Sequence, residues 1–546
     1  MSFIGVDIGS RSVRSVAIDS DDNILASSEV PISYQIDPDD DTYITANQQE
    51  VWDALIRALR STIEELNDTT VSGICIDATC SLVVSRLEPT GELVPQNVSS
   101  HYDDSSIPDR GIVFWMDHRG EKLTLENEQL DKLGGSFIPE MAIPKLRQIY
   151  EDVGEDFKNL KFFDLHDWFE YRLVGEKSEI TEVNSEPGGV DGSLKGFHVD
   201  FLNKQCGIPI KSDQIGRGDN LGTGLPFAGQ PIGFLDLEIA HLLGLDKPPI
   251  ILSGLIDCYA SFFATFYRPI SSVLPQETMI MVAGTSACFL TVAKKPRDPP
   301  KGIWGGFRIL PDYWFYEGGL SCCGILIENL FRDHPCGFDS EQIAKPSFWD
   351  EFETTVDKAT SHLDNEWFLN AHKLYSGDYL GNRTPYSDSN LSAYIIGDSM
   401  IKNKEDLVSR YLLILEYIVL QARLILECFI DDGFLIRNVV ISGSLGKNER
   451  FLRLLQMVMS ELGIRVMRSG KVDFKTHAAF GSAELAKYGC KGREYRVPSD
   501  DQFEPIKCSV DPKVVALMDI KRKFAKRMRK SQQAMNEEVK LLEEQN

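Results

Sequence analysis

The sequence predicts an α/β protein built from two duplicated domains, and three observations lead to this fold class. The chain has 546 residues, which is enough for more than one domain with its own core. At two distant places, an apolar run rich in β-branched residues enters a glycine turn and leaves it as another apolar strand. Strand patterns alternate with helical patterns in both halves, as is typical of α/β domains.

The first half contains elements in a clear order. Strands are predicted at 3–8, 13–18 and 24–32, followed by a helix at 48–66 and a strand at 71–77. Three strands, a helix and a strand make one α/β unit, and its first hairpin carries the first glycine turn. This order places that turn at the edge of a sheet.

The second half repeats this opening. A strand is predicted at 250–254, and the strands at 279–283 and 287–293 enclose the second glycine turn. The later elements are a long helix at 405–432, a strand at 438–442, a helix at 447–462 and a helix of small residues at 476–488. Small residues there would allow close approach to a sheet or a ligand. We therefore predict domains at 1–254 and 255–490.

A partly helical tail at 491–546 completes the predicted organisation. Its helix at 512–546 carries many lysines and arginines and then an acidic end. Such charge runs are typical of solvated helices, and binding to a partner is the alternative interpretation.

Composition restricts the classes of partner. Acidic residues outnumber basic ones by 82 to 57, and the formal net charge is −25, which argues against nucleic acid or an anionic membrane as main partner. The eleven cysteines form no zinc-binding spacing and fit reduced thiols. Charged residues interrupt the apolar stretch at 411–430, which favours a core helix, and no export signal is visible. We expect a cytoplasmic protein.

The two turns carry groups that bind phosphate. Glycine allows close approach of the backbone, successive N–H groups form an anion site, and hydroxyls add donors. A plain hairpin is the alternative for either turn alone, but the pair predicts a nucleotide held between the two halves. The candidates are Gly9, Ser10, Arg11 and Ser12 in the first turn and Gly284 and Thr285 in the second. A third glycine segment at 439–448 could cover an adenine.

Several short motifs occur in a specific order. In the first half they are Gly5–Arg14, Asp77–Val83, Trp115–Arg119, Pro139–Leu146 and Phe163–Asp167. In the second half they are Ile256–Ala260, Gly284–Ser286, Gly302–Phe307, Glu317–Gly319 and Gly381–Pro385. Together they resemble the FGGY family of carbohydrate kinases, within the actin-like ATPase (ribonuclease H-like) fold, over about residues 3–490. The run Thr79–Val83 resembles its D-ribulokinase subgroup.

This resemblance implies two domains with an interdomain cleft and assigns roles to acidic residues. Asp257 matches the catalytic base that takes a proton from the attacking sugar hydroxyl, and it also lies near the metal. Asp7 matches the aspartate that orients Mg²⁺ beside the phosphates, usually through water. The alternatives are a helix-capping or turn aspartate at 257 and a turn residue at 7.

The resemblance also covers the ligand-binding segments. The two glycine turns match its phosphate loops, and Gly443 and Asn448 match its adenosine segment, although Ser444 stands where a second glycine is usual. The implied sugar contacts are Thr79, Cys80, Ser81, Asp117, Arg119, Lys145 and Glu317. For Arg119 and Lys145, surface or interdomain pairing is an equal alternative.

Three departures from the family pattern bear on the sugar. A lysine usual in the ribulokinase branch is missing from the segment 182–189. Leu320 stands where glutamine is common, and Cys258-Tyr259 replaces Ala-His beside the expected base. The resemblance therefore predicts the reaction more firmly than the sugar.

The predicted reaction transfers the γ-phosphoryl group of ATP to a ketopentose, with D-ribulose forming D-ribulose 5-phosphate. Other pentoses or pentitols (L-ribulose, D-xylulose, ribitol) remain alternatives, as does a non-catalytic nucleotide-binding protein of the same fold. We expect ATP and Mg²⁺ as ligands beside the sugar, and we leave a homodimer open. No Walker A or protein-kinase signature occurs.

Overall fold

The computed structural model describes most of the chain. The described residues are those of 1–546 other than 67–69, 103, 105, 108, 122–133, 135–136, 176–198, 205, 217–226, 267–272, 344, 346, 470–471, 474, 493–502 and 544–546. The segment 182–189, from which the family's lysine is missing, lies outside them.

The first half of the chain builds a six-stranded sheet. Its order is β11 (Pro231–Phe234), β12 (Ile250–Ile256), β6 (Val71–Ala78), β1 (Ser2–Ile8), β2 (Ser12–Ile18) and β3 (Ile24–Pro31). The strands β12, β6 and β1 run parallel, whereas β1 and β2 form the predicted antiparallel hairpin. Every residue of β1 is buried, because helices cover both faces of the sheet. The predicted helix after β3 is α1 (Gln48–Glu65), capped by the Asn47 side chain.

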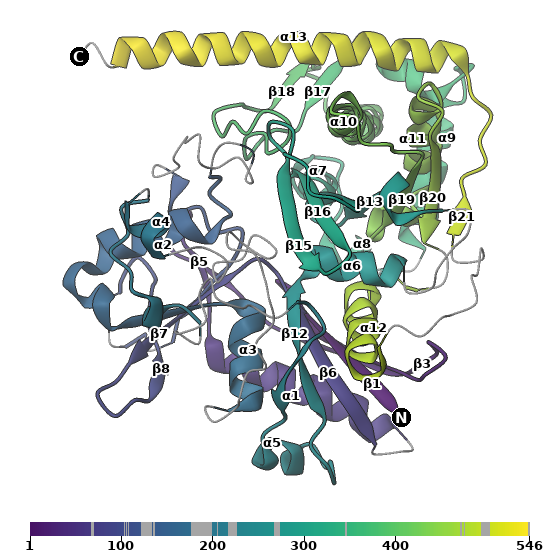
Figure 1. Ribbon diagram of the computed structural model, residues 1–546. Helices are drawn as coiled ribbons and strands as arrows, with labels where there is room; N and C mark the ends of the chain where they lie inside the picture. Colours follow the sequence, from purple (N-terminus) through teal and green to yellow (C-terminus); the bar gives the residue numbers. More distant parts are fainter. Residues whose placement is uncertain are drawn as a thin grey trace.

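A second, smaller sheet lies beside the first (Figure 1). Its strands are short and were mostly not predicted. They are β10 (Leu160–Asp164), β7 (Leu82–Leu87), β9 (Ile112–Val113), β5 (Ile44–Ala46) and β4 (Gln35–Ile36), with β8 (Leu93–Pro95) paired to β7. The helices of this half are α2 (Ala142–Val153), α3 (Leu165–Val174), α4 (Val199–Lys204) and α5 (Leu237–Leu242).

The second half builds a seven-stranded sheet that repeats the start of the first. Its order is β15 (Trp304–Leu310), β16 (Tyr313–Leu320), β14 (Ala287–Ala293), β13 (Thr278–Ala283), β19 (Asn438–Ser442), β20 (Arg465–Ser469) and β21 (Phe503–Pro505). The hairpin β13–β14 is antiparallel and β19 is parallel to β13, as β6 is to β1. The predicted duplication is thus visible in the strand pairing.

The three helices predicted for the second half agree with α10, α11 and α12 to within a few residues, whereas α7, α8 and α9 were not predicted. The long helix is α10 (Lys404–Asp431), and most of its side chains are buried, as expected for a core helix. The other elements are α7 (Gly324–Asp333), α8 (Ser340–Ile343), α9 (Phe348–Thr360), α11 (Glu449–Ser460) and the small sheet of β17 (Leu374–Ser376) and β18 (Tyr394–Ile396).

Two helices connect the halves. The small-residue helix α12 (His477–Lys491) packs on β1 of the first sheet and on α6 (Asp257–Thr265), although in the chain it follows β20 of the seven-stranded sheet. A Cβ at Gly5 would overlap backbone atoms of Ala479 and Ala483, and one at Gly481 would overlap the backbone of Ala260. Glycine is therefore required at both positions, because each backbone lies against another backbone.

The tail corrects one expectation. Its helix α13 (Pro512–Glu543) lies along the second half of the molecule beside α10, β17 and β18 (Figure 1). Lys521 pairs with Glu416 at 2.5 Å, Arg529 pairs with Asp378 at 2.9 Å, and all four side chains are buried. The prediction of a solvated helix is wrong for this part of the tail, because two of its basic residues form ion pairs with buried acidic residues that are distant in sequence.

We expect Arg529→Ala to lower the free energy of unfolding by about 3–5 kcal/mol, because it leaves the buried Asp378 carboxylate without its ion-pair partner. Arg527→Ala is the matched control: the same residue type on the same helix, but exposed, with an expected change within about 0.5 kcal/mol. Urea denaturation of both variants measures the difference. Equal effects of the two substitutions would contradict a specific role for Arg529.

Candidate active site

Three carboxylates gather at one edge of the first sheet. Asp7 and Asp77 are direct partners in the parallel pairing of β1 and β6, and Leu255 of β12 pairs with Asp77. Asp257 follows β12 immediately and begins α6. Because the carboxyl ends of parallel strands meet at the same sheet edge, these residues come together from three distant parts of the sequence.

The electrostatics of this cluster follow from its burial. Burial raises the pKa of Asp7, against the opposing effect of the Arg14 guanidinium, whose Nη1 lies 3.1 Å from Asp7 Oδ2. Burial, and then the neighbouring Asp7 charge, hold the pKa of Asp77 well above its usual range. Sequence reasoning did not select Asp77, although it stands at the end of a buried strand within a quoted motif.

Asp257 has the properties of a base that works near neutral pH. Burial, then the charge of Asp7, raises the pKa of Asp257 to about 7, and the charge of Glu317 adds to this. A backbone N–H bond from Cys258 to Asp257 Oδ1, 2.7 Å long, opposes the rise. The helix cap is Ile256, so Asp257 is the first helical residue and its carboxylate lies at the positive end of α6.

The first glycine turn presents part of its predicted set. Gly9 N–H donates to Ser12 O across the turn, and Ser10 Oγ accepts a hydrogen bond from Trp115 Nε1 at 3.0 Å. Arg11 is exposed at the tip. Ser12 differs, because it is buried on β2 and its hydroxyl donates to Glu29. The structure thus places Gly9, Ser10 and Arg11 at the tip and directs Ser12 Oγ elsewhere.

The second turn is attached to a helix. Gly284 O accepts from Gly324 N–H and Thr285 O accepts from Cys323 N–H, both at 2.9 Å, so the tip lies against the start of α7. A Cβ at Gly324 would overlap Gly284 O. One turn further along α7, Glu328 lies 3.9 Å from Arg11 of the first tip. The two tips therefore face the same helix end, which supports the predicted pairing.

The third glycine segment lies next to the second turn. Gly443 has φ +90°, and a Cβ there would overlap the Ala283 backbone at the end of β13, so both conformation and space require glycine. Asn448 caps α11 through Phe451 N–H and donates to Tyr411 Oη at 2.6 Å. These contacts give Asn448 a structural role in addition to the predicted adenosine contact.

The Thr79–Ser81 segment lies beside the first tip. Thr79 N–H donates to Ile8 O at the end of β1, and the hydroxyls of Thr79 and Ser81 are 2.9 Å apart. Trp115 N–H donates to Ser81 Oγ at 3.1 Å, while its ring N–H reaches Ser10. Cys80 between them is half-buried. Trp115 therefore connects the predicted sugar segment with the predicted phosphate turn.

Asp117 and Arg119 form a buried pair. Their side chains are fully buried, and two guanidinium nitrogens of Arg119 donate to the two Asp117 oxygens at 2.8 and 2.9 Å. Arg119 also donates to Val98 O and lies over the Tyr43 ring, while Asp117 accepts from Ile44 N–H. Both groups are committed to protein partners, and the pairing of Arg119 is buried and local rather than on the surface or between domains.

Lys145 is likewise committed. Its Nζ donates to the carbonyl oxygens of Phe114, Trp115 and Glu140 at 2.8 to 2.9 Å, which uses all three ammonium protons. The side chain is fully buried, and burial lowers its pKa to about 8. Lys145 thus holds the Trp115 loop in place.

Glu317 differs, because it is a buried carboxylate close to the base. Tyr259 Oη donates to Glu317 Oε2 at 2.8 Å, and Arg383 Nη2 lies 3.3 Å from Oε1. Tyr259, one of the departures from the family pattern, thus orients Glu317. Leu320, another departure, is buried in the core of the second half. Arg383 was not selected from the sequence, although it lies in a quoted motif.

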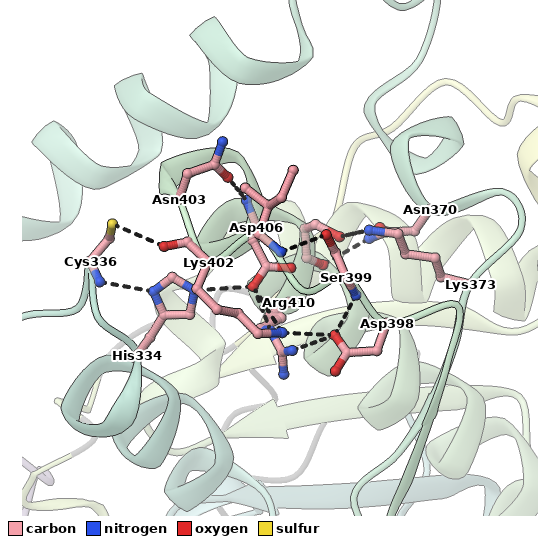
Figure 2. Close-up of polar contacts among 12 residues, drawn as sticks. His334, Cys336, Asn370, Lys373, Asp398, Ser399, Lys402, Asn403, Asp406 and Arg410 are labelled. Carbon is pink, nitrogen blue, oxygen red and sulfur yellow. Dashed lines mark hydrogen bonds and ion pairs between the residues drawn. The ribbon is translucent and has the colours of Figure 1, made fainter.

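A separate pocket of about 320 Å³ lies in the second half, between α7, α10, β17 and β18. Figure 2 shows its polar network: His334 and Arg410 contact Asp406 at 3.1 and 2.9 Å, and Lys402 contacts Asp398 at 3.0 Å. These charged groups pair with one another, and the contact of His334 with Asp406 connects the end of α7 to the start of α10. We assign the network a structural role.

The carboxylates of Asp7 and Asp257 suit a hard divalent cation. Mg²⁺ prefers oxygen ligands, the charge of Asp7 acts on Asp257, and Arg14 pairs with Asp7 alone. Asp7 and Asp257 are the residues that would hold the ion, directly or through water.

Two family models match the chain. The N-terminal domain model of the FGGY family of carbohydrate kinases matches residues 2–186, and the C-terminal domain model matches residues 279–489. The chain therefore belongs to the FGGY family of carbohydrate kinases. It is a sugar kinase, and this family implies a sugar and ATP as substrates.

Similar proteins agree with this family. A Saccharomyces cerevisiae protein named D-ribulokinase is 33% identical over 534 residues, which cover 90% of this chain and 72% of the relative. A Staphylococcus aureus protein named ribulokinase is 25% identical and covers 94% and 93%. Among solved structures, a xylulose kinase from Lactobacillus acidophilus has TM-score 0.70 at 15% identity and covers 97% of this chain and 98% of its own. This likeness shows the two-domain fold. Among the described residues, no helix is long and apolar enough to cross a membrane.

Proposed function

We propose that this protein transfers the γ-phosphoryl group of MgATP to a hydroxyl of a ketopentose, and that D-ribulose is its best substrate. The observation that carries the proposal is the environment of the Asp257 carboxylate. Burial and the charges of Asp7 and Glu317 raise its pKa to about 7. The relative named D-ribulokinase supports the choice of sugar.

The proposed phosphate contacts come from both halves. Backbone N–H groups at Gly9 to Arg11 and at Gly284 to Thr285, with the hydroxyls of Ser10 and Thr285, would hold the phosphates. Since the transition state of phosphoryl transfer spreads charge over equatorial oxygens, such fixed donors contribute mainly by position and electrostatics. Gly443 and Asn448 are proposed to flank the adenosine. Mg²⁺, held by Asp7 and Asp257, would neutralise charge on the β- and γ-phosphates.

Asp257 is proposed to accept the proton of the attacking hydroxyl. Its ionised form is the base, and the adjacent Asp7 charge increases its proton affinity. Glu317, held by Tyr259 and Arg383, is the proposed acceptor for another sugar hydroxyl. Thr79, Cys80 and Ser81 border the same region from the first half.

A panel of sugars tests the substrate. ADP release with D-ribulose, L-ribulose, D-xylulose and ribitol is compared with a no-sugar control. We expect D-ribulose to have the highest kcat/KM, with a modest margin, because each hydroxyl contact contributes only about 0.5–1.5 kcal/mol. If no pentose or pentitol raises ADP release above the ATP-only rate, the proposal is wrong and nucleotide binding without pentose turnover replaces it.

We expect Asp257→Asn to lower turnover by roughly 10²- to 10⁴-fold because the proton acceptor is lost, while ATP binding stays nearly intact because Asp7 and the proposed phosphate turns remain. In the parent protein, kcat/KM should fall as the pH drops through about 7, since protonation removes the base, and should level off above it. Steady-state kinetics across pH measure both. Variant turnover within threefold of the parent would remove Asp257 from the mechanism.

We expect Gly284→Val to weaken ATP binding without unfolding the chain. A Cβ at Gly284 meets only Ser286 O, at 3.9 Å, so the fold has space for a side chain there. The isopropyl group would instead occupy the space proposed for phosphate. Calorimetric titration with MgATP measures the affinity, and a thermal melt serves as the folding control. Unchanged affinity in the folded variant would show that this turn is only a hairpin.

A further inference from the structure

Two cysteines and a glutamate form a compact cluster beside Asp257. Cys258 follows Asp257 on α6, Cys288 lies on β14, and Glu317 lies on β16. Their two sulfurs and one carboxylate oxygen are all within 4.8 Å of one another, and Cys258 Sγ is 3.8 Å from Glu317 Oε2. Cys258 and Glu317 are buried, whereas Cys288 is half-buried. The cluster thus has an accessible side.

Strand register explains why these groups meet. In the antiparallel pairing of β14 and β16, Leu290 is opposite Glu317 and Cys288 is opposite Gly319. Cys288 and Glu317 are therefore diagonal neighbours on one face of the sheet. The first turn of α6 adds Cys258 to this face. The arrangement rests on the sheet core rather than on a loop.

The chemistry of the three groups points to a soft divalent cation. Zinc binds cysteine sulfur at about 2.3 Å, and tetrahedral geometry then separates two ligand atoms by about 3.8 Å, close to the spacing of this cluster. Magnesium and calcium prefer oxygen ligands and would not select thiols. Two thiolates, one carboxylate and Zn²⁺ sum to one negative charge, and Arg383, 3.3 Å from Glu317, can balance it.

We propose that Cys258, Cys288 and Glu317 form a binding site for a thiophilic divalent cation such as Zn²⁺, and that its occupation inhibits the sugar kinase. The inhibitory part rests on the proposed function, whereas binding does not. Binding of both sulfurs as thiolates releases the thiol protons of Cys258 and Cys288 to solvent.

Inhibition follows from the position of the cluster. A cation on Glu317 Oε2 occupies the lone pairs that now accept from Tyr259 and that would otherwise be offered to a sugar hydroxyl. We therefore expect inhibition that is strongest at low sugar concentration.

Direct binding of zinc tests the site. The full chain, chelator-treated and kept reduced by a phosphine, is dialysed against Zn²⁺ without nucleotide or sugar, and Cd²⁺ is used to detect the ultraviolet absorption of a cadmium–thiolate bond. Cys258→Ser and Cys288→Ser should each weaken binding at least tenfold. Cys508→Ser, which removes a partly exposed thiol beside α11, should not change it. Unchanged affinity in folded variants of both cluster cysteines would overturn the site.

Sugar-dependent ADP release at buffered free Zn²⁺ tests the inhibition. The parent and Cys508→Ser should lose activity as Zn²⁺ saturates the site, and Cys288→Ser should keep its activity. Thermal melts establish that each variant is folded. Zinc binding without inhibition would overturn the inhibitory part alone. If no sugar is turned over, the proposed function fails, and the dialysis experiment still decides the metal site.

Discussion

The parallel pairing of β1, β6 and β12 is the constraint on which the candidate site depends. It brings the carboxyl ends of these strands to one edge and sets Asp7, Asp77 and the start of α6 side by side. Burial, and then the charge of Asp7, raise the pKa of Asp257. A shift of this register by one residue would place the Asp7 and Asp77 side chains on opposite faces of the sheet, so the carboxylates would no longer lie together.

Close backbone packing joins the two halves around this edge. The helix α12 returns from the second half and lies directly against β1, an approach that requires glycine at position 5, while glycine at position 481 allows its close contact with α6. On its other side α12 contacts α6, which begins with Asp257. The base is thus fixed by elements from both ends of the chain. Such packing favours a defined position over adaptability.

Buried charges in this protein are matched by specific partners. Asp117 and Arg119 satisfy each other, Lys145 satisfies three carbonyl groups, and Arg529 of the tail satisfies Asp378. An unpaired charge in such positions would cost several kcal/mol, so these residues serve the fold whatever ligand binds nearby. The Glu317 carboxylate is also partnered, but its partners Tyr259 and Arg383 hold it next to Asp257.

The sequence by itself determined the order of the elements that open each half, the duplicated hairpins and their glycine turns, and Asp257 at the end of a strand. Periodicity and turn residues are local signals, so these elements could be predicted closely. Only the tertiary structure decided which polar side chains are free. Arg119 and Lys145 look like ligand groups in the sequence, yet the fold commits Arg119 to Asp117 and Val98 O and commits Lys145 to three carbonyl groups. Asp77 and the docking of α13 depend on contacts between distant segments, which no local pattern encodes.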